Sequence, residues 1–173
     1  MLRLQYCIIT GITILIALAC QPQERKKDKE LVMDKMEIVR QKFFQSLWNE
    51  HEFDIAHEIF TDDFYTESMS FENSNWIDMH GKGAESMIHH IRWWLEIIPD
   101  AKMHITGIAE SDTMVVVTWQ LVGTMKGKLL DYLPNHKLLE ISGCSQIYFK
   151  GDRIKMNRTL LDKYGLFVQI GAL

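Results

Sequence analysis

The chain contains the stretch SGCSQIYFKGDRIKMNRTLLD at residues 142–162, in which two β-strand patterns flank Lys150, Gly151 and Asp152. A glycine beside an aspartate between two such patterns is typical of a tight turn, so the stretch predicts a β-hairpin. It carries one carboxylate at the turn, a second at its far end, Asp162, and no histidine. The hairpin is therefore a reaction site, the wall of a binding site or the back of a core, and the rest of the chain bears on that choice.

Helical patterns come before Pro99. Apolar side chains recur at helical spacing in residues 31–51, which predicts one long amphipathic helix. A short helix is expected at residues 53–60, followed by a turn into a short strand at 61–68. Another long helix is expected at residues 84–98, where Pro99 ends it.

After Pro99 the apolar side chains alternate with polar ones, which is the period of a β-strand. Strands are expected at residues 101–108, 113–125, 137–149 and 152–161. Helices first and antiparallel strands afterwards predict an α+β domain, with its helices on one face of a curved sheet.

The composition suits one globular domain. The 173 residues are 47% hydrophobic and 24% charged, with a net charge of −4, and a chain of this size can bury a sizeable core. The mildly acidic balance argues against nucleic acid as a partner, because that would need a clustered basic surface. The only cysteines are Cys7, Cys20 and Cys144, so no disulfide framework is implied.

Residues 1–19 are predicted to be a signal peptide. Arg3 precedes an uncharged apolar run that is shorter than the about 20 residues of a membrane-spanning helix. The run ends in Ala17-Leu18-Ala19-Cys20, which resembles a bacterial lipoprotein signal, although leucine at 17 and a small residue at 18 would be more usual. Plain secretion and an uncleaved anchor are the alternatives.

The lipoprotein interpretation makes Cys20 the lipidated first residue of the mature chain. Residues 20–34 then form that residue and a polar tether, and the folded domain occupies residues 35–173. We therefore expect the protein in the bacterial cell envelope, attached to a membrane by its lipid anchor and facing the periplasm or the outside.

Seven pieces in order across residues 35–171 resemble the SnoaL-like polyketide cyclases, which have the nuclear-transport-factor-like, cystatin-like cone fold. They include the opening helices up to Asp62-Asp63-Phe64, the step IIPDAKMHI out of the third helix, the turn YFKGDRI and the tail LDKYGLFVQIG. The resemblance implies a cone-shaped, curved, mostly antiparallel sheet wrapped around one long N-terminal helix and two further helices. It also implies frequent pairing of subunits through the sheet, so a homodimer is expected.

In these cyclases a histidine on the penultimate strand and an aspartate on the last strand flank the substrate, and the aspartate is the general acid and base of an aldol closure. The resemblance puts Ser145 at the histidine position and Thr159 at the aspartate position. Neither hydroxyl titrates near neutral pH, so the pair suits hydrogen bonding better than proton transfer. Ser145 shares the apolar face of its strand, whereas Thr159 is out of phase with Ile154, Met156 and Leu160 unless a β-bulge intervenes.

A cone fold leaves a pocket between its long helix and its sheet. Trp48, Tyr65 and Trp119 are the candidate lining residues beside Ser145 and Thr159, with core packing as the alternative for each aromatic ring.

Two carboxylates remain as weak catalytic candidates. Glu67 is expected near the pocket mouth. Asp162 is expected as a cap or turn residue before the tail, with a surface salt bridge or a relocated base as alternatives, and burial would have to raise its pKa for that last role.

No metal and no cofactor are expected. His89 and His90 are adjacent and therefore diverge by about 100° around a helix, whereas helical zinc ligands sit three or four residues apart. His90 is expected to border the core.

The sequence leaves several functions open. The replaced acid–base pair favours a binding module for a small hydrophobic molecule. The alternative is a cyclase- or isomerase-type enzyme that uses Asp162 or Glu67, although fold alone is weak evidence for activity. A structural, dimeric envelope lipoprotein is the further alternative.

Overall fold

The computed structural model describes residues 34–68 and 81–173. The predicted signal peptide, Cys20, nearly all of the tether and the loop at 69–80 lie outside the described residues. Within the described ranges, no helix is both long and apolar enough to cross a membrane.

The long N-terminal helix consists of two consecutive segments, α1 (Lys35–Glu37) and η1 (Ile38–Asn49). The backbone of η1 is π-helical, and at its end the N–H of Glu50 bonds to the carbonyl of Gln45, five residues earlier. Two helices follow, α2 (Ile55–Ile59) and α3 (Ala84–Ile97). The helix η1 buries one apolar side, formed by Ile38, Val39, Phe43, Phe44, Leu47 and Trp48.

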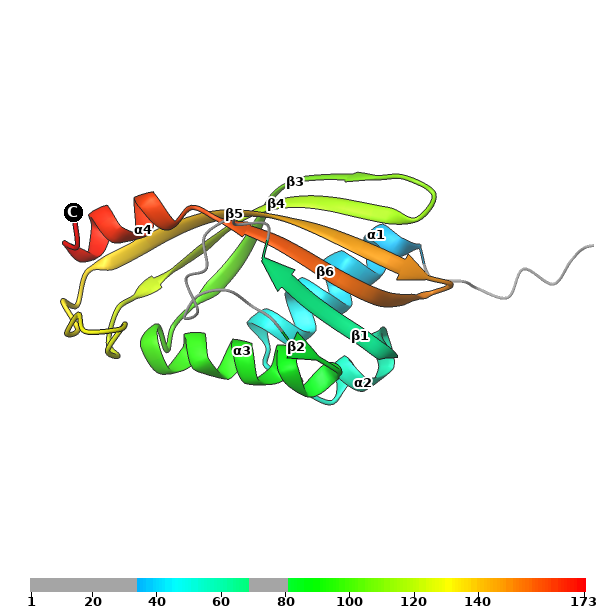
Figure 1. Ribbon diagram of the computed structural model, residues 1–173, viewed down its shortest axis with the longest axis horizontal. Coiled ribbons are helices and arrows are strands. Elements are labelled where there is room, and N and C mark those ends of the chain that lie inside the picture. The colour runs from blue at the N-terminus through cyan, green and yellow to red at the C-terminus, as the bar shows by residue number, and fades with distance from the viewer. Residues whose placement is uncertain (1–33, 69–80) are drawn as a thin grey trace, which may run out of the picture. The chain divides into compact units, whose positions relative to one another are not determined.

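One sheet contains all the strands of the described residues: β1 (Phe60–Ser68), β2 (Gly81–Lys82), β3 (Lys102–Glu110), β4 (Met114–Thr124), β5 (Leu138–Lys150) and β6 (Arg153–Leu161). Their order is β2-β1-β6-β5-β4-β3, and every pair is antiparallel except β1 and β6. The helices α2 and α3 lie on one side of β5 and β6, below them in the view of Figure 1. The predicted α+β cone fold is confirmed.

The inner face of the sheet supplies one side of the core. Along β4 the side chains of Val115, Val117, Trp119 and Leu121 are all buried, as the alternation predicts. They form one hydrophobic cluster with the apolar sides of η1 and α3, so the sheet and helices share a single core.

A β-bulge on β6 decides which of its side chains point inward. Phe149 pairs with Ile154 but Tyr148 pairs with Met156, so Lys155 is an extra residue on that strand. Beyond the bulge the inward phase passes to Asn157 and Thr159, which pair with Ile147 and Ser145.

The assignment of Leu160 to the apolar inner phase is therefore wrong. Leu160 is 47% exposed, and it pairs with Cys144 on the outer face of the sheet. Because one extra residue exchanges the two faces of a strand, a strict alternation from Ile154 onward misplaces every later residue.

Strand periodicity does not predict the last helix, α4 (Lys163–Ile170). Asp162 caps it, because its Oδ1 accepts the N–H of Gly165 at 2.8 Å. The side-chain amide of Gln169 exchanges two hydrogen bonds with the backbone of Glu140, at 2.8 and 2.9 Å. These bonds hold α4 against β5.

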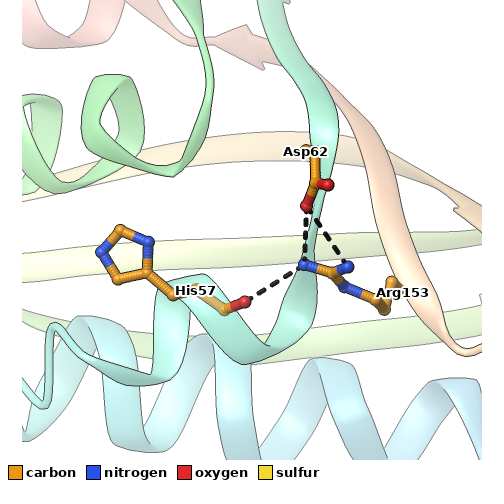
Figure 2. A network of polar contacts seen from close by, with 3 residues as sticks. All are labelled: His57, Asp62 and Arg153. Carbon is orange, nitrogen blue, oxygen red and sulfur yellow. Dashed lines mark hydrogen bonds and ion pairs between the residues drawn. The ribbon is translucent and has the colours of Figure 1, made fainter.

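A polar contact fixes the corner between α2 and β1 to the start of β6. The guanidinium of Arg153 donates to the carbonyl of His57 at 3.1 Å and contacts Asp62 Oδ1 at 3.5 Å (Figure 2). The carboxylate of Asp62 is fully exposed, so the contact is mainly a geometric restraint and adds little stability.

Candidate functional site

A cavity lies between the helices η1 and α3 and the inner face of the sheet. Its volume is about 50 Å³. Its wall is mostly apolar and aromatic, with a few polar side chains, as small-molecule sites usually are. The lining residues are Phe43, Phe44, Trp48, His90, Trp94, Met103, Trp119, Leu121, Ile141, Ser145, Asn157, Thr159, Leu161 and Lys163.

Neighbouring strands contribute a chain of hydrogen bonds to the cavity wall. The indole N–H of Trp119 donates to Ser145 Oγ at 3.0 Å, and the hydroxyls of Ser145 and Thr159 are 3.0 Å apart. The Nδ2 of Asn157 donates to Thr159 Oγ1 at 3.1 Å. We call these four side chains the sheet network. All of them are neutral at every physiological pH.

Trp119 occupies its place because residue 143 is a glycine. The two residues are cross-strand partners, and a Cβ on Gly143 would lie 2.2 Å from the indole ring. The bare backbone lets the ring lie flat across β5, where its N–H reaches Ser145. Gly143 therefore positions the first donor of the sheet network.

His90 reaches the cavity from α3. Its Nε2 accepts the indole N–H of Trp94 at 3.1 Å, so the ring proton is on Nδ1. Burial, with a smaller contribution from the charge of His89, lowers the pKa of His90 to about 4. The ring of Trp48 meets the imidazole edge-on, with 6.1 Å between centroids. His90 is therefore a neutral imidazole at pH 7, with its lone pair already occupied.

The described residues contain no group of three or more histidine, cysteine, aspartate or glutamate side chains arranged to hold a metal ion. The cavity wall in the same part of the chain has no carboxylate, and its cationic side chain is Lys163.

The structure brings four of the predicted pocket residues together. Trp48, Trp119, Ser145 and Thr159 all line the cavity. Thr159 is there because of the bulge at Lys155, which was the stated condition for its facing inward.

Tyr65 and Glu67 are not brought to the cavity. They lie on either side of Thr66, which pairs with the inward-facing Asn157, so both point to the other face of β1. Glu67 accepts a hydrogen bond from the guanidinium of Arg158, and this contact raises the pKa of Arg158.

Asp162 does not line the cavity either. It caps α4 with one carboxylate oxygen and borders a shallow groove on the outer face of the sheet. Its position is therefore that of a helix cap, the role expected for it before the tail.

The sequence profile of the SnoaL-like polyketide cyclases matches residues 38–170. The chain belongs to this family. No curated protein matches the sequence.

Solved structures share the cyclase fold. A protein of Jannaschia sp. CCS1 assigned to the SnoaL-like polyketide cyclases is 18% identical, with a TM-score of 0.67 over 80% of this chain and 92% of that one. TsrD of Streptomyces laurentii is 15% identical, with a TM-score of 0.68 over 82% and 99% of the two chains. IdmH of Streptomyces antibioticus, assigned as a polyketide cyclase, is 14% identical, with a TM-score of 0.67 over 80% and 99%. At these identities the similarity shows the fold alone.

Sequence reasoning missed three polar lining residues of this SnoaL-like chain, namely His90, Asn157 and Lys163. His90 was expected at the edge of the core, and its contact with Trp94 at the i, i+4 spacing was the available signal. Asn157 was hidden by the bulge, and Lys163 by the unpredicted helix α4.

Proposed function

We propose that this SnoaL-like chain binds a small, neutral, mostly apolar molecule in the cavity and does not transform it. The observation that carries the proposal is the chemistry of the wall. Ser145 and Thr159 stand where the resemblance implies a histidine and an aspartate, and they bond to each other through neutral hydroxyls. A hydroxyl pair can orient a ligand, but it cannot accept a proton at neutral pH.

His90 does not supply the missing base. A general base needs a free lone pair and a pKa near the working pH. The lone pair of His90 accepts the N–H of Trp94, and its pKa is about 4. Since Glu67 and Asp162 are engaged elsewhere, the cavity favours binding over the enzymatic alternative.

The size of the cavity limits the ligand. A volume of about 50 Å³ is room for about two water molecules, and an engineered cavity that admits benzene has about 150 Å³. A polyketide would have to displace wall side chains, so the ligand that fits without rearrangement has only a few non-hydrogen atoms.

Saturation-transfer NMR on the full chain in detergent tests this proposal. The probes are neutral molecules of roughly two to four non-hydrogen atoms, a range set by the cavity volume. We expect binders that compete with one another and that are lost in Ser145→Trp, because the new ring would fill the cavity. Cys144→Trp is the matched control, since Cys144 is the next residue on β5 and borders the outer groove.

Each outcome has a distinct meaning. Binding that Ser145→Trp abolishes and Cys144→Trp retains supports the proposal. Binding that both variants retain, or no binding by the wild-type chain, overturns it and favours a structural envelope protein. Chemical conversion of a bound probe would favour the cyclase- or isomerase-type alternative.

We also propose that lipidated Cys20 attaches the chain to a bacterial membrane. The sequence Ala17-Leu18-Ala19-Cys20 supports this, together with the apolar run that precedes it. The mass of the chain from membranes should equal residues 20–173 plus a lipid modification, and Cys20→Ala should remove that modification. An unmodified mass for the wild-type chain would contradict the proposal.

A further inference from the structure

The sheet network leaves one buried acceptor without a partner. Asn157 is 2% exposed and lines the cavity. Its Nδ2 bonds to Thr159, whereas its Oδ1 has no hydrogen-bond partner among the residues that the structure describes. Buried amide oxygens are nearly always satisfied, so this atom requires a donor from outside the chain, either a water molecule or the ligand that displaces it.

The same network also holds one hydroxyl proton in surplus. Ser145 and Thr159 have one proton each, and only one of these lies between the two oxygens. Ser145 already accepts the N–H of Trp119, and Thr159 accepts the amide of Asn157. With the Nδ2 of Asn157 directed at Thr159, the described residues offer no acceptor for the second proton, whichever hydroxyl carries it.

An unpaired acceptor and a spare donor therefore lie on neighbouring inward positions of β5 and β6. A ligand group that satisfies both must donate and accept at once. A hydroxyl does this with one atom. A ketone or ether only accepts, a carboxylate has no proton, and an ammonium would face a wall whose described residues include no carboxylate.

We propose that the ligand is an alcohol whose hydroxyl donates to Asn157 Oδ1 and accepts from the hydroxyl pair of Ser145 and Thr159. This inference rests on the proposed binding function and specifies its ligand class. It makes the site selective for alcohols over the corresponding ketones, because a ketone leaves Asn157 Oδ1 unpaired.

Propan-2-ol and acetone are the matched probes for this cavity of about 50 Å³, since they have the same carbon skeleton and acetone is the smallest ketone. Their affinities for the full chain in detergent are measured by NMR titration. We expect propan-2-ol to bind about tenfold more tightly, the effect of one buried hydrogen bond. In Asn157→Leu, which has a similar shape and no acceptor, the ratio should fall to about one.

Two further variants keep the test decisive. Arg158→Gln changes the next residue on β6, which faces away from the cavity, and should keep the preference. Thr159→Val removes one hydroxyl with little change in shape and should reduce the preference even if Asn157→Leu fails to fold.

The two hypotheses fail differently. If neither probe binds the wild-type chain, the proposed function fails. If both bind with equal affinity, or if Thr159→Val and Asn157→Leu keep the preference, binding stands and the alcohol inference is overturned.

Discussion

Strand β6 separates two kinds of chemistry on its two faces. Asn157 and Thr159 point inward, where they join neutral hydrogen bonds in an aromatic cavity. Between them Arg158 points outward and pairs with Glu67. The inner groups have few alternative partners, whereas the side chains of Glu67 and Arg158 are 29% and 41% exposed to water.

This difference indicates where function and stability are concentrated. In a low-dielectric interior a missing partner leaves a group desolvated and unpaired, so even a conservative substitution lowers the free energy of unfolding strongly. At a partly exposed position water replaces the partner. Substitutions on the inner face should therefore have large effects, and those on the outer face small ones.

The largest expected effect is the loss of folding stability when acid protonates His90. Its pKa in the folded chain is about 4, below the 6.5 of an unperturbed histidine. Between these values the unfolded chain binds a proton that the folded chain does not. The contribution of neutral His90 to the free energy of unfolding is therefore fully present above pH 6.5. As the pH falls towards 4, about 3 kcal/mol of this free energy is lost.

Denaturant unfolding from pH 7 to pH 4 measures this loss. His90→Gln keeps an acceptor for Trp94 and should flatten the profile, although His51, whose pKa is also lowered, retains part of the slope. His104 is exposed on β3, so His104→Gln is the matched control and should leave the slope unchanged. Equal slopes in His90→Gln and the wild type would contradict a neutral imidazole at position 90.

The second effect concerns Gly143 and its neighbour on β5. The Cβ of Gly143→Ala would lie 2.2 Å from the ring of Trp119, so the ring has to move away from Ser145. We expect the free energy of unfolding to fall by about 2 kcal/mol. Cys144→Ala, on the outer face, should change it by less than about 1 kcal/mol. Similar losses of unfolding free energy in both variants would mean that the inner and outer faces of β5 do not differ in their sensitivity to substitution.

Much of this fold follows from the sequence, because period-two alternation and a proline boundary are strong signals. Val115, Val117, Trp119 and Leu121 were all expected on one face of a strand, and all are buried. Ser145 was expected inward on the same grounds and is 3% exposed.

The remainder depends on interactions that a local pattern does not contain. The bulge at Lys155 has no glycine to mark it, so the switch of phase that brings Asn157 inward is visible only in the pairing with β5. Helix α4 is held by Asp162 and by the bonds between Gln169 and Glu140, which are 29 residues apart. The tautomer of His90 likewise depends on the orientation of the ring of Trp94.

The third effect comes from the centre of the sheet network. Ser145→Ala leaves the N–H of Trp119 and one bond of Thr159 without a partner. The free energy of unfolding should fall by about 1–2 kcal/mol, the usual consequence of an unsatisfied buried donor. The double variant Ser145→Ala, Thr159→Val should lose less than the sum of the single variants, because the two hydroxyls share a bond. Strict additivity in denaturant unfolding would mean that the hydroxyls do not interact.

The smallest effect on stability is expected at the ion pair of Glu67 and Arg158 on the outer face of the sheet. Glu67→Gln removes one charge of a partly exposed ion pair, and water can solvate Arg158 in its place. The melting temperature should stay within experimental error of the wild type, both at low salt and at 0.5 M salt, where screening weakens such pairs. A clear drop that salt does not reduce would mean that this face is desolvated in solution, as it would be beneath a second copy of the chain. Sedimentation at the same protein concentrations distinguishes that case, because a dimer interface on the outer face would also weaken the association in Glu67→Gln.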